Sequence, residues 1–249
     1  SDQRLLLWIF MNKSSVNCAS FSIDPPEKWH FDQNIPDTFE SHIEKSVPFF
    51  STCHELVVNL GHYFIFKDAQ VVELGTSTGH LAHQLAVQYQ AQNAQVLGID
   101  ISEKMIEFAQ NSYPHPNLTF VHDDITTRDF PATDLFVSFY TLQFIHPQFR
   151  APLVAKIYQQ LHLGGGFILF EKTRAKDARF QDINTDLYTD FKLKNNFSID
   201  EVHQKKKQLV GVLEPFTNDE NMALLEGAGF SKIMPIFQYL CFQGYLAIK

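Results

Sequence analysis

The 249-residue sequence is poor in cysteine and carries no excess of positive charge, and both shortages exclude classes of function. Its three cysteines, Cys18, Cys53 and Cys241, lie far apart and form no CxxC pair, which argues against a disulfide framework and against a zinc site. The formal net charge is −8, so no overall field draws the chain to a phosphate backbone or to an anionic membrane surface. We therefore expect a cytoplasmic protein without a metal, and without direct contact with nucleic acid or membrane.

Long apolar runs are also missing. The run near the start, from Leu5 to Phe10, is too short to span a membrane and lacks the small-residue cleavage site of a secretory signal. Met11 follows this run, so we interpret residues 1–28 as a leader or disordered extension and place the folded domain at residues 29–249. With 45% of its residues hydrophobic, the chain is long enough to bury one α/β core and a small cap.

The most informative segment extends from Ala69 to Asp100. It predicts a short apolar strand, a tight turn at Gly75–Gly79, an amphipathic helix from His80 and a second apolar strand that ends at Asp100. Glycines permit a sharp reversal and the close approach of a ligand, and the helix after the turn offers free N–H groups. A carboxylate about 20 residues beyond such glycines is where a ribose diol is held. The segment therefore predicts a nucleoside-binding site.

Apolar strands and helices alternate along the chain, which is typical of a parallel sheet buried on both faces. We predict an α/β fold of the Rossmann-like type, with a seven-stranded, mostly parallel sheet and helices on both faces. Helices within residues 29–68 would form an N-terminal cap, and a helical insertion at residues 174–215 would form a lid over the carboxyl ends of the strands. The glycines 164–166 are expected to end the helix before strand five. The expected strands are residues 70–74, 95–100, 118–122, 135–140, 167–170, 233–237 and 245–248.

The residues of the turn distinguish between nucleosides. A dinucleotide-binding loop has glycine at the position of Ser77, and here the acidic Glu73 precedes the first glycine. The pattern acid-x-Gly-x-(Gly/Ser)-x-Gly resembles motif I of class I S-adenosylmethionine (SAM) methyltransferases. This resemblance implies SAM, S-adenosylhomocysteine or carboxy-SAM as the ligand. The alternative interpretation is a tight turn in a Rossmann-like domain that binds nothing there.

Residues at the ends of different predicted strands are expected to bind different parts of the ligand. Asp100 is expected to hold the ribose hydroxyls, and Asp124 with Ile125 the adenine, although Asp124 could instead cap a turn. His80, His146 or Tyr140 could serve as a general base. The full set of expected cofactor-binding residues is Phe50, Glu73, Gly75, Thr76, Ser77, Gly79, Asp100, Ile101, Asp124, Ile125 and Phe139.

Further motifs narrow the resemblance. Ser46-Val47-Pro48 before the core, Thr141–Phe144 after the fourth strand, Glu171-Lys172, Gln204-Lys205 and Ala228–Phe230 occur in this order. Together they resemble carboxy-S-adenosylmethionine synthases, formerly described as tRNA (uridine-5-oxyacetate) methyltransferases, over about residues 31–249. The resemblance implies prephenate as carboxyl donor and a part in tRNA wobble-uridine modification. It also implies that a lid residue holds the carboxylate of the product.

The chain departs from that pattern at three expected ligand contacts. Lys206 takes the place of the lid arginine, Phe50 that of a tyrosine and Phe139 that of an asparagine. A lysine supplies charge but not the two-pronged geometry of arginine. We interpret the chain as a SAM-dependent transferase that acts on a small, anionic molecule, with Lys206 at the reacting end. The alternatives are a true carboxy-SAM synthase and a non-catalytic SAM-binding module. Apolar residues at helical spacing in the lid, from Phe180 to Phe191, predict that this helix forms part of a homodimer or closes over the site.

Overall fold

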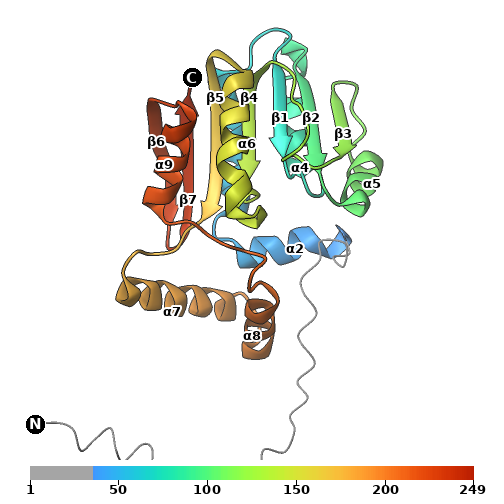
Figure 1. The fold of residues 1–249 in the computed structure, drawn as a ribbon. Helices are drawn as coiled ribbons and strands as arrows, with labels where there is room; N and C mark the ends of the chain where they lie inside the picture. Colours follow the sequence, from blue (N-terminus) through green and yellow to red (C-terminus); the bar gives the residue numbers. More distant parts are fainter. Residues whose placement is uncertain (1–35) are drawn as a thin grey trace, which may run out of the picture.

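Seven strands form one sheet in the order β3-β2-β1-β4-β5-β7-β6, and helices cover both of its faces (Figure 1). The computed structural model describes residues 36–249, so the interpretation of residues 1–28 lies outside the described residues, as does the start of the expected cap. The strands are β1 (Gln70–Leu74), β2 (Gln95–Asp100), β3 (Leu118–His122), β4 (Thr133–Phe139), β5 (Leu161–Lys172), β6 (Lys232–Tyr239) and β7 (Phe242–Ile248). The α-helices are α2 (Pro36–Ser46), α3 (Phe50–Leu60), α4 (His80–Gln88), α5 (Glu103–Ser112), α6 (Pro147–Gln160), α7 (Ala178–Lys194), α8 (Ile199–Gln208) and α9 (Asn218–Ala228).

The first five strands run parallel, and β7 lies antiparallel between β5 and β6. This arrangement confirms the predicted Rossmann-like, seven-stranded, mostly parallel sheet. The chain passes from β1 to β2 on one side, and β4 pairs with β1 on the other, so the strand order reverses at β1. In doubly wound sheets a ligand binds at the carboxyl end of the strands beside such a reversal.

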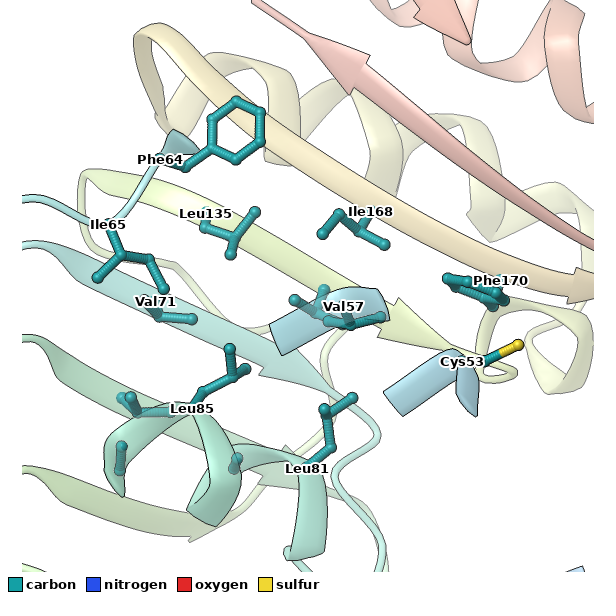
Figure 2. Packing of buried hydrophobic residues seen from close by; sticks show 14 of the residues in the cluster. Cys53, Val57, Phe64, Ile65, Val71, Leu81, Leu85, Leu135, Ile168 and Phe170 are labelled. Atoms are coloured by element: carbon teal, nitrogen blue, oxygen red, sulfur yellow. The ribbon is translucent and has the colours of Figure 1, made fainter. Parts of the chain in front are cut away.

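Two apolar clusters, one on each face of the sheet, form the core. Figure 2 shows the first, in which Cys53 and Val57 of α3 and Leu81 and Leu85 of α4 pack against strand residues such as Val71. The second lies under α6 and α9 and contains buried residues of both helices. Because α3 contributes fully buried side chains, it is part of the core and its inner face is fixed against the sheet.

The expectation that glycines 164–166 end a helix is wrong. Helix α6 ends at Gln160, and all three glycines lie within β5. The pairing of β5 with β4 is irregular here, since Leu161 pairs with Thr133 and Gly166 with Leu135. At Gly166 a side chain would come within 2.9 Å of the ring of Phe64. The glycines therefore permit the irregular pairing of β5 with β4 and the close contact with the Phe64 ring.

Two helices occupy the expected lid region, and both lie beyond the carboxyl ends of the strands (Figure 1). Helix α2 lies between α8 and the sheet, whereas Tyr188 of α7 contacts Phe242 of β7, with ring centroids 5.3 Å apart. A capping box formed by Ser198 and Glu201 begins α8, as the sequence predicts. Two hydrogen bonds link α7 to α2: the Tyr188 hydroxyl donates to the Ser46 carbonyl at 2.9 Å, and the Asn195 amide donates to the Lys45 carbonyl at 3.1 Å. No helix among the described residues is long and apolar enough to cross a membrane.

Candidate active site

A cavity of about 900 Å³ lies between the carboxyl ends of the parallel strands and the helices α2, α7 and α8. Residues at or just after the ends of β1 to β5 line it, among them Gly75, Asp100, Asp124, Phe139 and Lys172. Five neighbouring strand ends therefore open into one space, and each places a different kind of chemical group on its wall.

The turn after β1 has the conformation that its glycines predict. The backbone is left-handed at Gly75 (φ 72°), Ser77 (φ 51°) and Gly79 (φ 83°), a region in which glycine is far less strained than other residues. A side chain at Gly75 would collide with that of Thr141, and one at Gly79 would come within 2.6 Å of Phe120. The absence of a side chain at Gly75 therefore lets the Thr141 side chain pack directly against the backbone of the turn.

Asp100 fixes this turn and faces the cavity at the end of β2. Its Oδ2 accepts a hydrogen bond from the Ser77 backbone N–H at 2.8 Å, and its Oδ1 accepts one from the Ser102 N–H at 2.9 Å. Burial raises the pKa of this carboxyl, and the backbone N–H groups oppose that shift. A carboxylate that only accepts hydrogen bonds suits the two hydroxyls of a ribose. The residues present therefore fit a nucleoside.

Glu73 and Gly79 support the turn without lining the cavity. The Glu73 carboxylate is buried, accepts a hydrogen bond from the Thr76 hydroxyl at 2.6 Å, and has a pKa that burial raises to about 8. Gly79 caps α4. Both residues were expected to bind the cofactor. Their contacts in the structure instead support the conformation of the turn.

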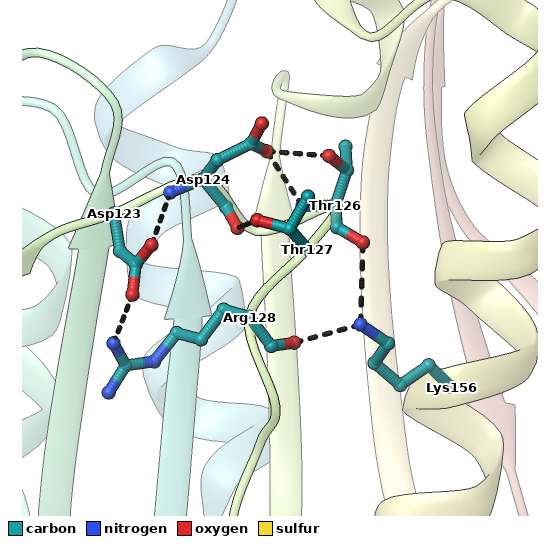
Figure 3. A network of polar contacts seen from close by, with 6 residues as sticks. All are labelled: Asp123, Asp124, Thr126, Thr127, Arg128 and Lys156. Carbon is teal, nitrogen blue, oxygen red and sulfur yellow. Dashed lines mark hydrogen bonds and ion pairs between the residues drawn. The ribbon is translucent and has the colours of Figure 1, made fainter.

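Asp124 belongs to a polar network just after β3, which Figure 3 shows. Its Oδ1 accepts hydrogen bonds from the backbone N–H and the hydroxyl of Thr126, at 2.8 and 2.7 Å. Asp123 pairs with Arg128 at 2.5 Å, and the Lys156 ammonium donates to the carbonyls of Thr126 and Arg128. Asp124 thus caps a turn and also lies on the cavity wall, next to the buried Ile125.

Aromatic rings surround the cavity at the end of β4. Phe139 is edge-on to Phe50, with ring centroids 5.5 Å apart, and His54 lies 4.4 Å from Phe50 and 4.7 Å from Phe139. The next residue, Tyr140, has a left-handed backbone with φ 58°, a strained conformation for a bulky residue that is concentrated at functional sites. The polar groups in this part of the wall include the imidazoles of His54 and His80 and the buried hydroxyl of Tyr140, which has no hydrogen-bond partner among the described residues.

Three lysines line the cavity near β5, α7 and α8. The ammonium groups of Lys172 and Lys192 lie 4.4 and 4.3 Å from the ring centroid of Tyr188, and Lys205 is on the facing helix. Burial is the main cause that lowers their pKa values, to about 8 for Lys192 and about 7 for Lys205, and repulsion among the lysines adds to it. A group that is hard to charge in the free protein gains charge readily when an anion binds beside it.

Lys206, the residue expected at the reacting end, does not line this cavity. Its side chain is exposed, although it is near enough to Lys172 to lower the pKa of that lysine. Of the suggested bases, His80 and Tyr140 lie on the wall, whereas His146 caps the start of α6. The expected cofactor residues that line the cavity are Phe50, Gly75, Thr76, Ser77, Asp100, Ile101, Asp124, Ile125 and Phe139.

Sequence reasoning missed His54, Lys192 and the role of Lys205. His54 stands among apolar residues on α3, a pattern that predicts only core packing. The signal for Lys192 is its position four residues after Tyr188, on the same face of α7.

Known proteins resemble the chain over most of its length. Residues 71–165 match a family of methyltransferase domains. The chain is 34% identical over 225 residues to the carboxy-S-adenosyl-L-methionine synthase of Staphylococcus epidermidis, covering 90% of this chain and 98% of that protein. It is 34% identical over 231 residues to the synthase of the same name from a Campylobacter jejuni strain, covering 92% and 97%.

Solved structures share the fold at low identity. Human N-acetylserotonin methyltransferase in complex with SAM superposes with a TM-score of 0.56 and 18% identity, covering 79% of this chain and 51% of that one. The cyclopropane synthase MmaA2 of Mycobacterium tuberculosis gives 0.57 and 15%, covering 78% and 66%. At this level of identity the likeness establishes the fold alone.

Proposed function

Since the chain belongs to the carboxy-S-adenosyl-L-methionine synthase family and is therefore a SAM-dependent transferase, we propose that it acts on a small anionic molecule bound beside SAM. One observation carries the proposal: the same cavity has the carboxylate of Asp100 toward one end and three lysines at the other. The carboxylate suits the hydroxyls of a ribose, and the lysines suit an anion.

The order of the strands supports this layout. Neighbouring strands lie about 4.8 Å apart, so the groups at their ends form a row that follows the sheet order β3, β2, β1, β4, β5. Adenine would lie near Asp124, ribose at Asp100 and the methionyl part over the Gly75–Ser77 turn. The reacting carbon would then face Phe139 at the end of β4, and the second substrate would extend to Lys172 at the end of β5.

When bound, SAM supplies a methyl carbon on a sulfonium sulfur, which is electrophilic in methyl transfer and would have to lose a proton to accept a carboxyl group. The chain's own residues orient the reactants and exclude water around that carbon, which is where most of the acceleration of a group transfer arises. Water would be excluded by the aromatic part of the cavity wall, which is formed by Phe50, Phe139 and Tyr140. Asp100 would fix the position of the ribose relative to the ends of the strands. No strongly basic or nucleophilic constellation is needed for this role.

The lysines explain the preference for an anion. Lys172, Lys192 and Lys205 are held near one another on the cavity wall, and their repulsion is relieved when a carboxylate binds among them. Because Lys206 is exposed outside this wall, we assign the main contact with the anion to Lys205, with Lys172 and Lys192 beside it. A cytoplasmic role in tRNA modification, which the sequence motifs imply by their resemblance to that family, is a further part of the proposal.

The proposal includes a homodimer. On α7, Phe180, Ile183 and Leu187 are 64%, 45% and 47% exposed, and a second copy of the chain would cover this apolar face. Light scattering on the wild type and on an Ile183→Glu variant tests it. A wild-type protein that remains monomeric at high concentration contradicts this part.

The decisive experiment identifies the ligand and the product. Mass spectrometry of the purified protein shows whether SAM, S-adenosylhomocysteine or carboxy-SAM is retained, because the three differ in mass. Incubation with SAM and prephenate, followed by mass analysis, then distinguishes carboxy-SAM synthesis from methyl transfer. Absence of SAM binding by calorimetry would refute the assignment of the site, and SAM binding without any turnover would favour a binding module.

A further inference from the structure

His54 is a buried imidazole on the cavity wall to which the proposed layout gives no role. It lies on α3, one turn after Phe50, and is 5% exposed. Its ring contacts Phe50, Phe139 and His80, with centroids 4.4, 4.7 and 5.7 Å away. No hydrogen bond to this ring forms among the described residues. Its nitrogens are not among the fully enclosed polar atoms without a partner, so they are open to the cavity that the ring lines. In apolar surroundings a polar group of a bound molecule is the partner that such a nitrogen lacks.

The surroundings of the imidazole favour its uncharged form. Burial is the main cause that lowers the pKa of His54, to about 3, and the neighbouring His80 contributes second. The other rings packed against it, those of Phe50 and Phe139, carry no charge. A neutral imidazole offers one N–H donor and one nitrogen acceptor, and a sulfonium in the same cavity would keep it neutral.

The position of His54 beside the end of β4 indicates that it contacts the second substrate rather than SAM. Phe139, which His54 touches, is at the end of β4, between the Gly75–Ser77 turn and Lys172. We propose that His54 is a substrate-binding residue whose imidazole forms a hydrogen bond with an uncharged hydroxyl group of the second substrate, an inference that rests on the proposed function. A hydroxyl both donates and accepts, so it can pair with either ring nitrogen. The carboxylate of the same molecule is attracted to the lysines.

This role makes His54 a residue that determines specificity. The rings of Phe50 and Phe139 can pack against any flat apolar group, and the lysines can bind any anion of suitable size. Neither the rings nor the lysines distinguish a ligand that has a hydroxyl group from one that lacks it. An unpaired nitrogen in this wall would disfavour an analogue that lacks the hydroxyl. Phenylpyruvate, a flat ring with a carboxylate, and its 2-, 3- and 4-hydroxyphenyl analogues are suitable probes, because they vary only the presence and position of that group.

Calorimetry on protein saturated with S-adenosylhomocysteine tests the proposal. We expect the wild type to bind one hydroxylated acid about 3- to 10-fold more tightly than phenylpyruvate. His54→Leu should abolish this preference, and His54→Gln, which keeps a donor and an acceptor, should retain part of it. The matched control is His83→Leu, since His83 stacks on Tyr113 outside the cavity wall and its loss should leave the preference unchanged.

The outcomes separate this inference from the function on which it rests. A wild type that binds all four acids equally, or a leucine variant that keeps the preference, overturns the role of His54 and leaves the proposed function intact. Binding of phenylpyruvate that is indifferent to Lys205→Met contradicts the anion site instead. If the wild type binds none of the acids, both proposals fail. Thermal unfolding of each variant identifies any that has lost its fold, in which case the glutamine variant decides.

Discussion

Two adjacent lysines of α8 offer a sharp test of the anion site. Lys205 lines the cavity, whereas Lys206 is exposed outside its wall. We expect Lys205→Met to weaken the binding of prephenate in the presence of S-adenosylhomocysteine, and Lys206→Met to change it little. Methionine keeps the length of the aliphatic stem in both variants, so the pair isolates the charge.

The expected size of the effect follows from the loss of one charge-assisted hydrogen bond. Such a bond contributes about 1.5 to 3 kcal/mol, which corresponds to about a 10- to 100-fold increase in Kd for Lys205→Met. Lys206 acts only at longer range, since it lowers the pKa of Lys172 from outside the wall. Exposed charges contribute about 1 kcal/mol or less, so Lys206→Met should change Kd less than about fivefold.

The pH dependence adds a second signature. The pKa values of Lys205 and Lys192 are lowered to about 7 and about 8, so the free site loses positive charge as the pH rises from about 6 to about 9. Anion affinity should fall over this range, and binding near pH 8 should take up protons, which calorimetry detects by comparing two buffers. Lys205→Met should show a shallower fall because one titrating group is gone. Equal effects of the two variants, or affinity independent of pH in the wild type, would refute the reasoning.

Three further predictions concern the SAM end and the stability of the ligand-free protein. Asp100→Asn should weaken SAM binding at least about tenfold by calorimetry, because an amide accepts poorly from two hydroxyls and disturbs the bond to Ser77; an unchanged Kd would contradict the assignment. Gly79→Ala should lower the free energy of unfolding in urea by about 1 to 3 kcal/mol, since a side chain there meets Phe120 at a left-handed backbone; a neutral outcome would mean that the turn relaxes freely. Finally, unfolded lysines bind more protons than folded Lys192 and Lys205 between about pH 7 and about pH 10, so these two groups should make stability rise with pH across that window; the Lys192→Met variant should show a smaller rise.

Local patterns were sufficient to predict the strands and the turn at which we propose that SAM binds. The bounds of β1, β2 and β3 match the predicted strands to the residue, because each is a short segment in which apolar residues predominate. The turn at Gly75–Gly79 is determined by its own glycines and by side chains within one βαβ unit. The sequence therefore contains nearly all the information needed to place Asp100.

Contacts between distant segments determine the rest, and the sequence does not display them. Successive residues of a helix point about 100° apart, so which of Lys205 and Lys206 lines a cavity depends on how α8 lies against α2 and α7. His54 belongs to the site only because β4 places Phe139 beside it, 85 positions further along the chain. The glycines 164–166 were misread for the same reason, since their partners are Phe64 and the strand β4.

The end of the cavity where we propose that SAM binds is held by more hydrogen bonds and buried contacts than the end formed by α7 and α8. Backbone hydrogen bonds from Gly75 and Thr76 to Ile99 and the bond from Ser77 to Asp100 fix the SAM end within the sheet. Helices α7 and α8, which form much of the other end, have no buried residues among those described, and elements with few buried contacts open at low free energy. Of the three positions at which the sequence departs from the resemblance, Lys206 lies on α8 at this second end, whereas Phe50 lies on the core helix α3 and Phe139 ends the central strand β4. Movement of α7 and α8 to fit a different second substrate would therefore leave in place the residues that we propose hold SAM.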